Sequence, residues 1–249
     1  MSLLSLRQTI FSDHNLLWNR RISRMTILHL DASVRRTDNP VSGHNSISKQ
    51  IAASFMDVWL TNAPQTTVIH RDIGINPPEF ISQDWIAAAF TQEVNRTAAQ
   101  RKVLALSDEL IEEVMAADTI VISTPMYNYG LPAALKAWFD QVIRINKTFS
   151  FDLERGDFPL SPTLAGKTLV LITSTGEFGF EAGGVREAMN HLGPHIRVMS
   201  HYLGVEQTYE ISAGYQEFGD SRHQASLKAA YSEAENLARS LTNRDQSIR

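Results

Sequence analysis

Short apolar runs alternate with amphipathic segments of helical length from Met25 onward. The runs are rich in β-branched residues and leucine, which is typical of strands that are covered on both faces. Parallel strands need crossover connections, and these are usually helices, so the alternation predicts an α/β fold with one doubly wound parallel sheet. The five predicted strands are 26–31, 66–72, 119–124, 167–174 and 207–211.

The segments between these runs carry apolar residues at helical spacing and therefore predict helices on both faces of the sheet. Pro132 stands in the first turn of one of them, where a missing N–H costs little. The predicted helical regions are 46–61, one or two helices within 84–115, 131–143, 185–203 with a break near Gly193, and 221–242.

The chain has 249 residues and shows no linker or repeat after Met25, so we expect a single domain over 25–245. Residues 1–24 are rich in arginine and poor in acids, a composition that an organellar targeting peptide would also show. Their apolar pieces are too short for a secretory signal. We interpret 1–24 as an N-terminal extension outside the fold.

The composition of the chain excludes several classes of function. The 23 basic and 27 acidic residues give a net charge of -4, which argues against a broad nucleic-acid surface. No apolar run is long enough to predict a membrane span. The sequence has no cysteine, which excludes disulfides, thiolate nucleophiles and iron–sulfur clusters. Redox chemistry would therefore need an organic cofactor or a metal held by histidine and carboxylate ligands.

Ligands of open α/β sheets bind beyond the carboxyl ends of the strands. After the first strand, Ser33 is followed by a polar loop that leads to Ser46 and Ser48 at the start of a helix. Hydroxyls and free N–H groups at a helix N-terminus suit an anion, although simple N-capping explains the same serines. The glycine-rich dinucleotide fingerprint is absent, so a terminal phosphate is favoured.

The turns after the third and fourth predicted strands also suit a ligand. The third strand ends in Pro-Met-Tyr-Asn-Tyr, whose apolar groups could lie along a flat heterocycle or fold back onto the core. The fourth ends in Thr-Ser-Thr-Gly-Glu, where Gly176 would allow close backbone approach or an ordinary turn. Three such turns at strand ends are more specific than any one alone.

Three motifs together resemble the FMN-dependent NADH-azoreductase and NADH:quinone oxidoreductase family. They are the Ser33…Ser46-Ile47-Ser48 loop, the block PMYNYGLPAALKAWFD at 125–140 and the TSTG turn at 173–176. The resemblance covers most of 25–241. It implies a flavodoxin-like sheet of strand order 2-1-3-4-5, a cytoplasmic homodimer and FMN bound tightly but without a covalent link.

The resemblance also assigns cofactor contacts to individual positions. It implies that Ser33, Ser46, Ile47 and Ser48 hold the FMN phosphate. Contacts to the flavin ring and its pyrimidine side are implied for Pro125, Met126, Tyr127, Asn128, Tyr129, Ser174, Thr175, Gly176 and Glu177. No side chain is expected to act as a catalyst, because the flavin carries the chemistry, and no metal ligand is assigned.

The predicted activity is a two-electron transfer from NADH or NADPH, by a ping-pong mechanism, to quinones, azo compounds or both. A flavodoxin-like electron carrier, a redox-regulated binding module and a general NAD(P)H-dependent flavin reductase remain alternatives. The expected partners are a small-molecule acceptor and a second copy of the chain, with neither nucleic acid nor a membrane. A second subunit would add a wall to the site. Residues 75–99, which include Trp85 and Phe90, are the candidate for that wall.

Other enzyme classes fit less well. The turn at Ser174 lacks the first glycine of a hydrolase nucleophile elbow. The Gly-Lys-Thr sequence at 166–168 has Ser161 in place of the leading glycine of a phosphate-binding loop, and its lysine begins a strand. His191, His195 and His201 do not form a known metal motif and are interpreted as polar helix positions.

Overall fold

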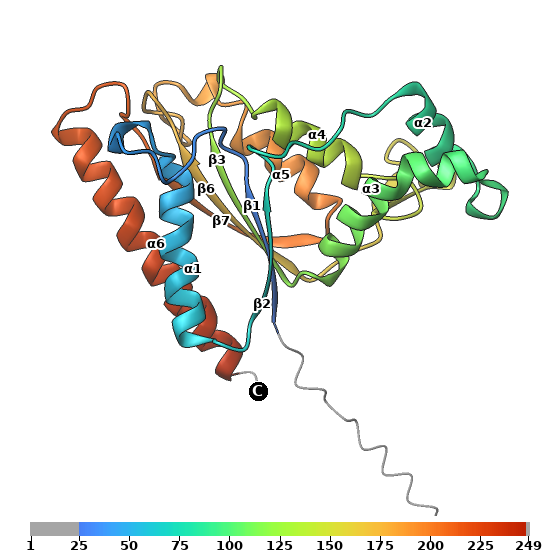
Figure 1. The fold of residues 1–249 in the computed structure, drawn as a ribbon, viewed down its shortest axis with the longest axis horizontal. Helices are drawn as coiled ribbons and strands as arrows, with labels where there is room; N and C mark the ends of the chain where they lie inside the picture. The colour runs from blue at the N-terminus through green and yellow to red at the C-terminus, as the bar shows by residue number, and fades with distance from the viewer. Residues whose placement is uncertain (1–24, 248–249) are drawn as a thin grey trace, which may run out of the picture.

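Five parallel strands form the central sheet of the computed structural model, which describes residues 25–247 (Figure 1). The strand order is β2-β1-β3-β6-β7, which is the predicted order 2-1-3-4-5 and confirms the fold class. The interpretation of 1–24 as an extension lies outside the described residues. The sheet strands are β1 (Thr26–Asp31), β2 (Thr67–Asp72), β3 (Thr119–Pro125), β6 (Lys167–Ser174) and β7 (Val205–Ala213).

Helices cover both faces of this sheet, because successive side chains of a strand point to opposite sides. Ile27 and Val121 face α1 (Ile47–Asn62) and α6 (Ser221–Ser247), and the alternate residues of the same strands, such as Leu28 and Ile120, belong to the opposite core. That second core is closed by α3 (Ala98–Ala116), α4 (Ala133–Val142) and α5 (Gly193–His201), on the other side of the sheet in Figure 1.

Several boundaries differ from the predicted ones. The predicted helical region 185–203 contains only α5 and a 3-10 turn at Glu187–Met189, and β7 extends beyond both ends of the predicted strand. An antiparallel pair of short strands, β4 (Phe149–Phe151) and β5 (Leu160–Pro162), was not predicted. Strands of three residues show too few alternating positions to give a periodic signal.

The region 84–115 divides into α2 (Gln83–Phe90) and α3 because Thr97 caps α3 in a capping box with Gln100. In α2, Trp85 is buried, and its indole N–H donates to Oε1 of Gln141 at 2.9 Å. Trp85 therefore packs inside its own subunit, and its interpretation as part of a wall facing a second subunit is wrong. Phe90 is 69% exposed and can still serve that purpose.

The carboxyl ends of the strands meet at one edge of the sheet, at the top of Figure 1. Backbone hydrogen bonds continue the ladder beyond the strands and fix the turns that follow. The N–H of Ala32 donates to the carbonyl of Ser123 at 2.8 Å, and the N–H of Met126 donates to that of Ser174 at 2.9 Å. The turns after β1, β3 and β6 are thereby joined side by side.

Among the described residues, no helix is long and apolar enough to cross a membrane.

Candidate functional site

Buried serines occupy the turn between β1 and α1. Ser33, Ser46 and Ser48 are each 3% exposed or less. The hydroxyl oxygen of Ser46 accepts from the N–H of Lys49 and lies 3.3 Å from that of Ser48, so the predicted N-capping is present. Ile47 and Ser48 begin the helix, where backbone N–H groups have no intrahelical acceptor. Capping therefore leaves these two donors available to an anion.

The end of β2 fixes the position of the Ser33 turn. The N–H of Gly74 donates to the backbone carbonyl of Asp31 at 3.0 Å. A Cβ atom at Gly74 would lie 2.0 Å from the carbonyl oxygen of Ser33, closer than any side chain can approach. Glycine is thus required here for the close approach of two backbone segments.

The loop from 34 to 45 forms one rim of this turn. The carbonyl of Arg36 accepts from the N–H of Ser46 at 2.8 Å, and the Arg36 guanidinium pairs with Asp38 through two hydrogen bonds. Asn45 closes the loop by accepting from the N–H of Asn39 at 2.7 Å. Asp38 balances the charge of Arg36 at this rim, so the attraction for an anion comes from the N-terminus of α1.

The turn after β3 is strained. Tyr127 and Gly130 exchange two backbone hydrogen bonds of 3.0–3.1 Å around Asn128 and Tyr129, whose φ angles are 47° and 67°. Asparagine tolerates this left-handed region, but for tyrosine it costs about 1–2 kcal/mol. Strain of this kind is kept at positions where the shape of the turn matters for function.

The turn after β6 adjoins the strained turn. Ser174 and Thr175 are buried, and the Thr175 hydroxyl donates to the carbonyl of Glu177 at 2.8 Å. The Glu177 carboxylate pairs with Arg186 at 2.9 Å. Its negative charge, together with a hydrogen bond, raises the pKa of the Tyr129 hydroxyl. The two turns therefore meet at Tyr129 and Glu177.

The sequence interpretation missed a fourth contribution, from the residues that follow β7. The N–H of Glu217 donates to the carbonyl of Gly176 at 3.0 Å, and a Cβ atom at Gly176 would lie 2.7 Å from the Glu217 side chain. Tyr215 stacks on Phe178 with ring centroids 4.5 Å apart. The aromatic residues that follow the fifth strand were the available signal. The segment that contains Tyr215 and Glu217 therefore packs against the turn after β6 and stabilises it.

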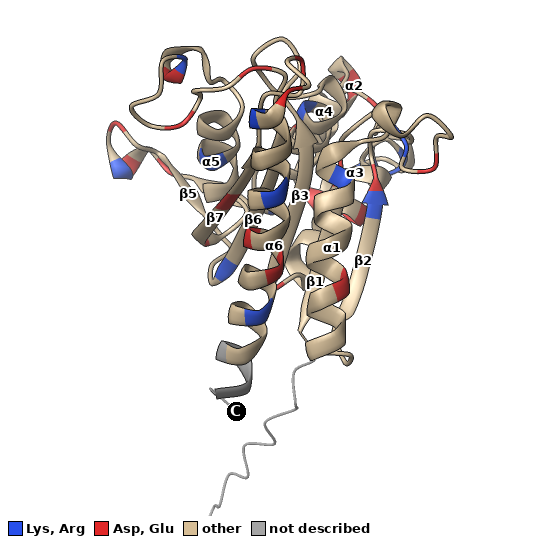
Figure 2. Cartoon of the chain, turned by 90° about the vertical axis from the view of Figure 1, so that its left-hand side faces the viewer, with Lys and Arg blue, Asp and Glu red and all other residues tan. Residues whose placement is uncertain are grey.

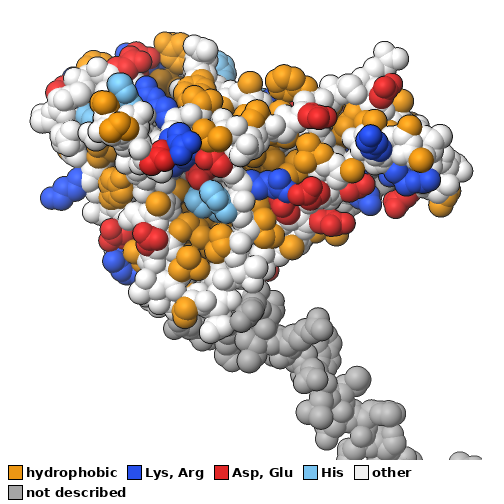
Figure 3. All heavy atoms as spheres, in the orientation of Figure 1, with side chains coloured by type: hydrophobic (Ala, Val, Ile, Leu, Met, Phe, Trp, Pro, Cys, Tyr) orange, Lys and Arg blue, Asp and Glu red, His pale blue; other side chains and the backbone are white. Residues whose placement is uncertain are grey.

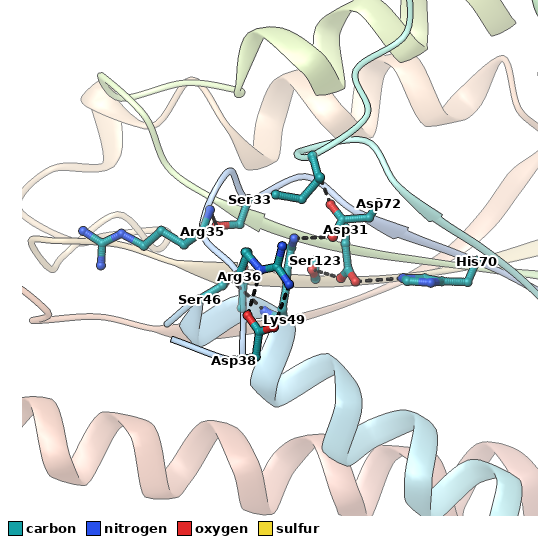
Figure 4. Close-up of polar contacts among 12 residues, drawn as sticks. Asp31, Ser33, Arg35, Arg36, Asp38, Ser46, Lys49, His70, Asp72 and Ser123 are labelled. Atoms are coloured by element: carbon teal, nitrogen blue, oxygen red, sulfur yellow. Dashed lines mark hydrogen bonds and ion pairs between the residues drawn. The ribbon is translucent and has the colours of Figure 1, made fainter. Parts of the chain in front are cut away.

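A cluster of polar side chains around the buried Asp31 carboxylate lies beneath the Ser33 turn, between the sheet and α1 (Figure 4). Burial alone would raise the pKa of Asp31, but the facing rings of His29 and His70 and the Ser123 hydroxyl hold it well below its usual range. The same contact with the carboxylate raises the pKa of His70. The Lys49 ammonium donates to Asp72 at 2.6 Å. The contacts of this cluster hold the end of β1 in place, and with it the Ser33 turn that follows.

The three turns that carry the predicted cofactor contacts lie on the neighbouring strands β1, β3 and β6. Buried hydroxyl and N–H donors lie at one end, where a phosphate needs them. Aromatic and thioether groups and a glycine turn lie at the other end, where a flat ring could rest. A cavity of about 320 Å³ adjoins that end and is lined in part by Met126, Thr175 and Phe178. The residues present fit FMN.

The charge distribution agrees with a local anion site. Figure 2 shows acidic and basic positions interspersed along α6 and over the loops, and the face in view shows no continuous basic stripe. The attraction for an anion is therefore local, at the N-terminus of α1.

Comparisons with known proteins agree with this geometry. A family model described as Flavodoxin-like fold matches residues 25–238. The FMN-dependent NADH:quinone oxidoreductase 2 of Colwellia psychrerythraea is 61% identical over 217 residues, which are 87% of this chain and 99% of the relative. The protein of the same name from Idiomarina loihiensis is 60% identical, with 87% and 90% of the two chains covered.

Solved structures show the same fold. The FMN-dependent NADH-azoreductase of Bacillus anthracis in complex with FMN superposes with a TM-score of 0.75. The superposition covers 88% of this chain and 99% of that one, at 19% identity.

We predict that Gly74→Ala displaces the Ser33 turn. The added methyl group cannot fit beside the Ser33 carbonyl, so the substitution should lower the free energy of unfolding by about 1–3 kcal/mol, as overpacking does, and weaken FMN binding. Urea unfolding and FMN titration measure the two effects. Gly43→Ala is the matched control, because a Cβ atom there meets nothing within 4 Å. Equal behaviour of the two variants would contradict the prediction.

Proposed function

Since the chain belongs to the family with the flavodoxin-like fold that includes the FMN-dependent NADH:quinone oxidoreductases, we propose that it is itself such an enzyme. The observation that carries this proposal is the juxtaposition of a buried, donor-rich helix N-terminus with two ligand-type turns on the neighbouring strands. When bound, FMN would supply the chemistry, a two-electron transfer from a reduced nicotinamide to a quinone.

The chain's own residues bind and orient the cofactor. Ser33, Ser46 and Ser48, with the N–H groups of Ile47 and Ser48, would hold its phosphate. Ring contacts would come from the turns after β3 and β6. In those turns the relevant residues are Pro125, Met126, Tyr127, Asn128, Tyr129, Ser174, Thr175, Gly176 and Glu177.

The ion pair of Glu177 with Arg186 closes the pyrimidine side of this site in our proposal. Both side chains are about three-quarters buried, and the Arg186 guanidinium also lies 4.8 Å above the Phe178 ring. Such a pair holds the β6 turn in one conformation and keeps water from that edge. No side chain in the three turns needs to act as a nucleophile or as an acid.

We further propose that donor and acceptor use one site in turn. Initial rates measured against NADH at several fixed quinone concentrations should then give parallel double-reciprocal lines. The purified protein should be yellow, and azo dyes should serve as second acceptors. Intersecting lines would contradict a ping-pong mechanism. A flavoprotein that does not oxidise NADH would favour the electron-carrier alternative, and turnover with free flavin alone would favour a flavin reductase.

We predict that Ser48→Ala weakens binding of FMN but not of riboflavin, because riboflavin lacks the phosphate. A hydrogen bond to a charged group contributes about 1.5–3 kcal/mol, so FMN affinity should fall about tenfold or more. Fluorescence titration of the apoprotein with each flavin measures the difference. Ser54→Ala, on the same helix but away from the turn, is the control. If Ser48→Ala weakens both flavins equally, the phosphate assignment is wrong.

We also propose that the enzyme is a cytoplasmic homodimer. Apolar side chains around α2 support the dimer: Phe80, Phe90 and Val94 are between 69% and 88% exposed. Hydrophobic side chains reach the surface over α4 and towards α2 in Figure 3. A partner that covers them would stand beside the site and add a wall against water.

We predict that Phe90→Glu shifts the chain towards monomer, because a buried charge at an apolar interface is costly. Light scattering coupled to size exclusion measures the mass of the variant and of the unaltered chain. Val103→Glu, at an exposed apolar position on α3, is the control for a surface charge. A monomeric unaltered chain would contradict the dimer.

A further inference from the structure

Two copies of a His-x-Asp sequence stand side by side in the sheet. His29-Leu30-Asp31 lies on β1 and His70-Arg71-Asp72 on β2, and the strand register sets His29 directly beside His70. Residues two apart on a strand point to the same face. All four side chains therefore face the α1 side of the sheet, and a surface cavity of about 570 Å³ opens over them.

Three of these side chains converge on one point, as Figure 4 shows for Asp31 and His70. Nε2 of His70 lies 2.8 Å from one carboxylate oxygen of Asp31, and Nε2 of His29 lies 3.2 Å from the other. The three potential ligand atoms all lie within 4.8 Å of one another. The two imidazole centroids are 4.8 Å apart.

These separations match a metal site. An ion held by nitrogen and oxygen ligands at about 2.0–2.2 Å in tetrahedral geometry places those ligand atoms about 3.3 Å apart. The distance from Nε2 of His29 to Oδ1 of Asp31 has this size, and Nε2 of His70 lies closer still to Oδ2, at 2.8 Å. The half-exposed His70 ring would rotate to bring its Nε2 atom to the same ion as Nε2 of His29 and one oxygen of Asp31.

A second observation, at the Nε2 atom of His29, supports a bound cation. The residue is 8% exposed, and this nitrogen makes no hydrogen bond, although it lies 3.2 Å from Oδ1 of Asp31. A buried polar atom without a partner is costly. A bound cation would take the lone pair of this nitrogen and remove that cost.

The surroundings complete the site. The Ser123 hydroxyl donates to Oδ1 of Asp31 at 2.5 Å and so orients the carboxylate, as residues around metal ligands do. The Lys49 ammonium is engaged by Asp72 at 2.6 Å, so its charge is already balanced. The side chain of His70 is 50% exposed, which gives an ion access from the cavity.

We propose that His29, Asp31 and His70 bind a divalent ion of the zinc type. The ligands are Nε2 of each histidine and one carboxylate oxygen, with water in the remaining position. Two imidazoles and one carboxylate favour Zn²⁺ and neighbouring transition metals over Mg²⁺ and Ca²⁺, which prefer oxygen ligands. The ion ties β1 to β2 beneath the Ser33 turn. The proposal does not depend on the proposed oxidoreductase activity.

The test uses the flavin-loaded, tag-free full chain after treatment with EDTA. Calorimetric titration with Zn²⁺ should show one site per chain, and Mg²⁺ should give no heat of binding. His29→Asn, His70→Asn and Asp31→Asn should each weaken Zn²⁺ binding about 100-fold or more, because changes around metal ligands alone already cost 10–100-fold. Ser123→Ala should show that smaller, 10–100-fold loss.

His195→Asn is the matched control, because His195 is an exposed histidine on α5, on the opposite side of the sheet. This variant should bind Zn²⁺ like the unaltered chain. Circular dichroism checks that each variant folds, and His70→Asn, at a half-exposed position, keeps the test valid if His29→Asn does not fold. Absence of stoichiometric binding, or equal binding by His70→Asn and the unaltered chain, would overturn the proposal.

Discussion

A buried carboxylate at the end of β1 organises this edge of the sheet. Asp31 is 6% exposed, and its side chain accepts from Ser123 on β3 and contacts His70 on β2. Its backbone carbonyl accepts from Gly74, which follows β2. Burying a charge is costly unless every oxygen is paired, so three strands must keep one register for Asp31 to be satisfied. The Ser33 turn begins two residues later, so that register also determines its position.

The same constraint explains why the proposed anion site lies close to the cluster of His29, Asp31 and His70. The side chain of Asp31, the last residue of β1, faces α1, and Ser33 follows two residues later in the turn that leads to that helix. The N-terminus of α1 attracts negative charge, whereas the carboxylate of Asp31 attracts positive charge. The Lys49 ammonium, from α1, pairs with Asp72 on β2. The two proposed sites, one for an anion and one for a cation, thus lie on the same side of the sheet.

The apolar pattern predicted the parallel sheet and the main helices because long apolar runs carry a strong signal, and the family resemblance implied the strand order that the structure has. The predicted strand ends located three ligand-type turns, which the structure places on neighbouring strands, and the family resemblance assigned cofactor contacts to them. The contribution of Tyr215 and Glu217 was missed because it depends on backbone contacts across strand ends. Trp85 was misassigned for a similar reason: an aromatic residue on an amphipathic helix does not reveal which surface covers it, and here Gln141 does.

The histidine cluster shows most clearly what a single sequence hides. Forty residues separate His29 from His70 along the chain, so no local spacing connects them. Only the pairing of β1 with β2 sets the two side by side, and a shift by one residue would turn His70 to the opposite core. That register is itself held by the cores on both faces of the sheet. The hydrophobic pattern of the strands therefore sets the register, and the register brings the two histidines together. No motif in the sequence shows this proximity.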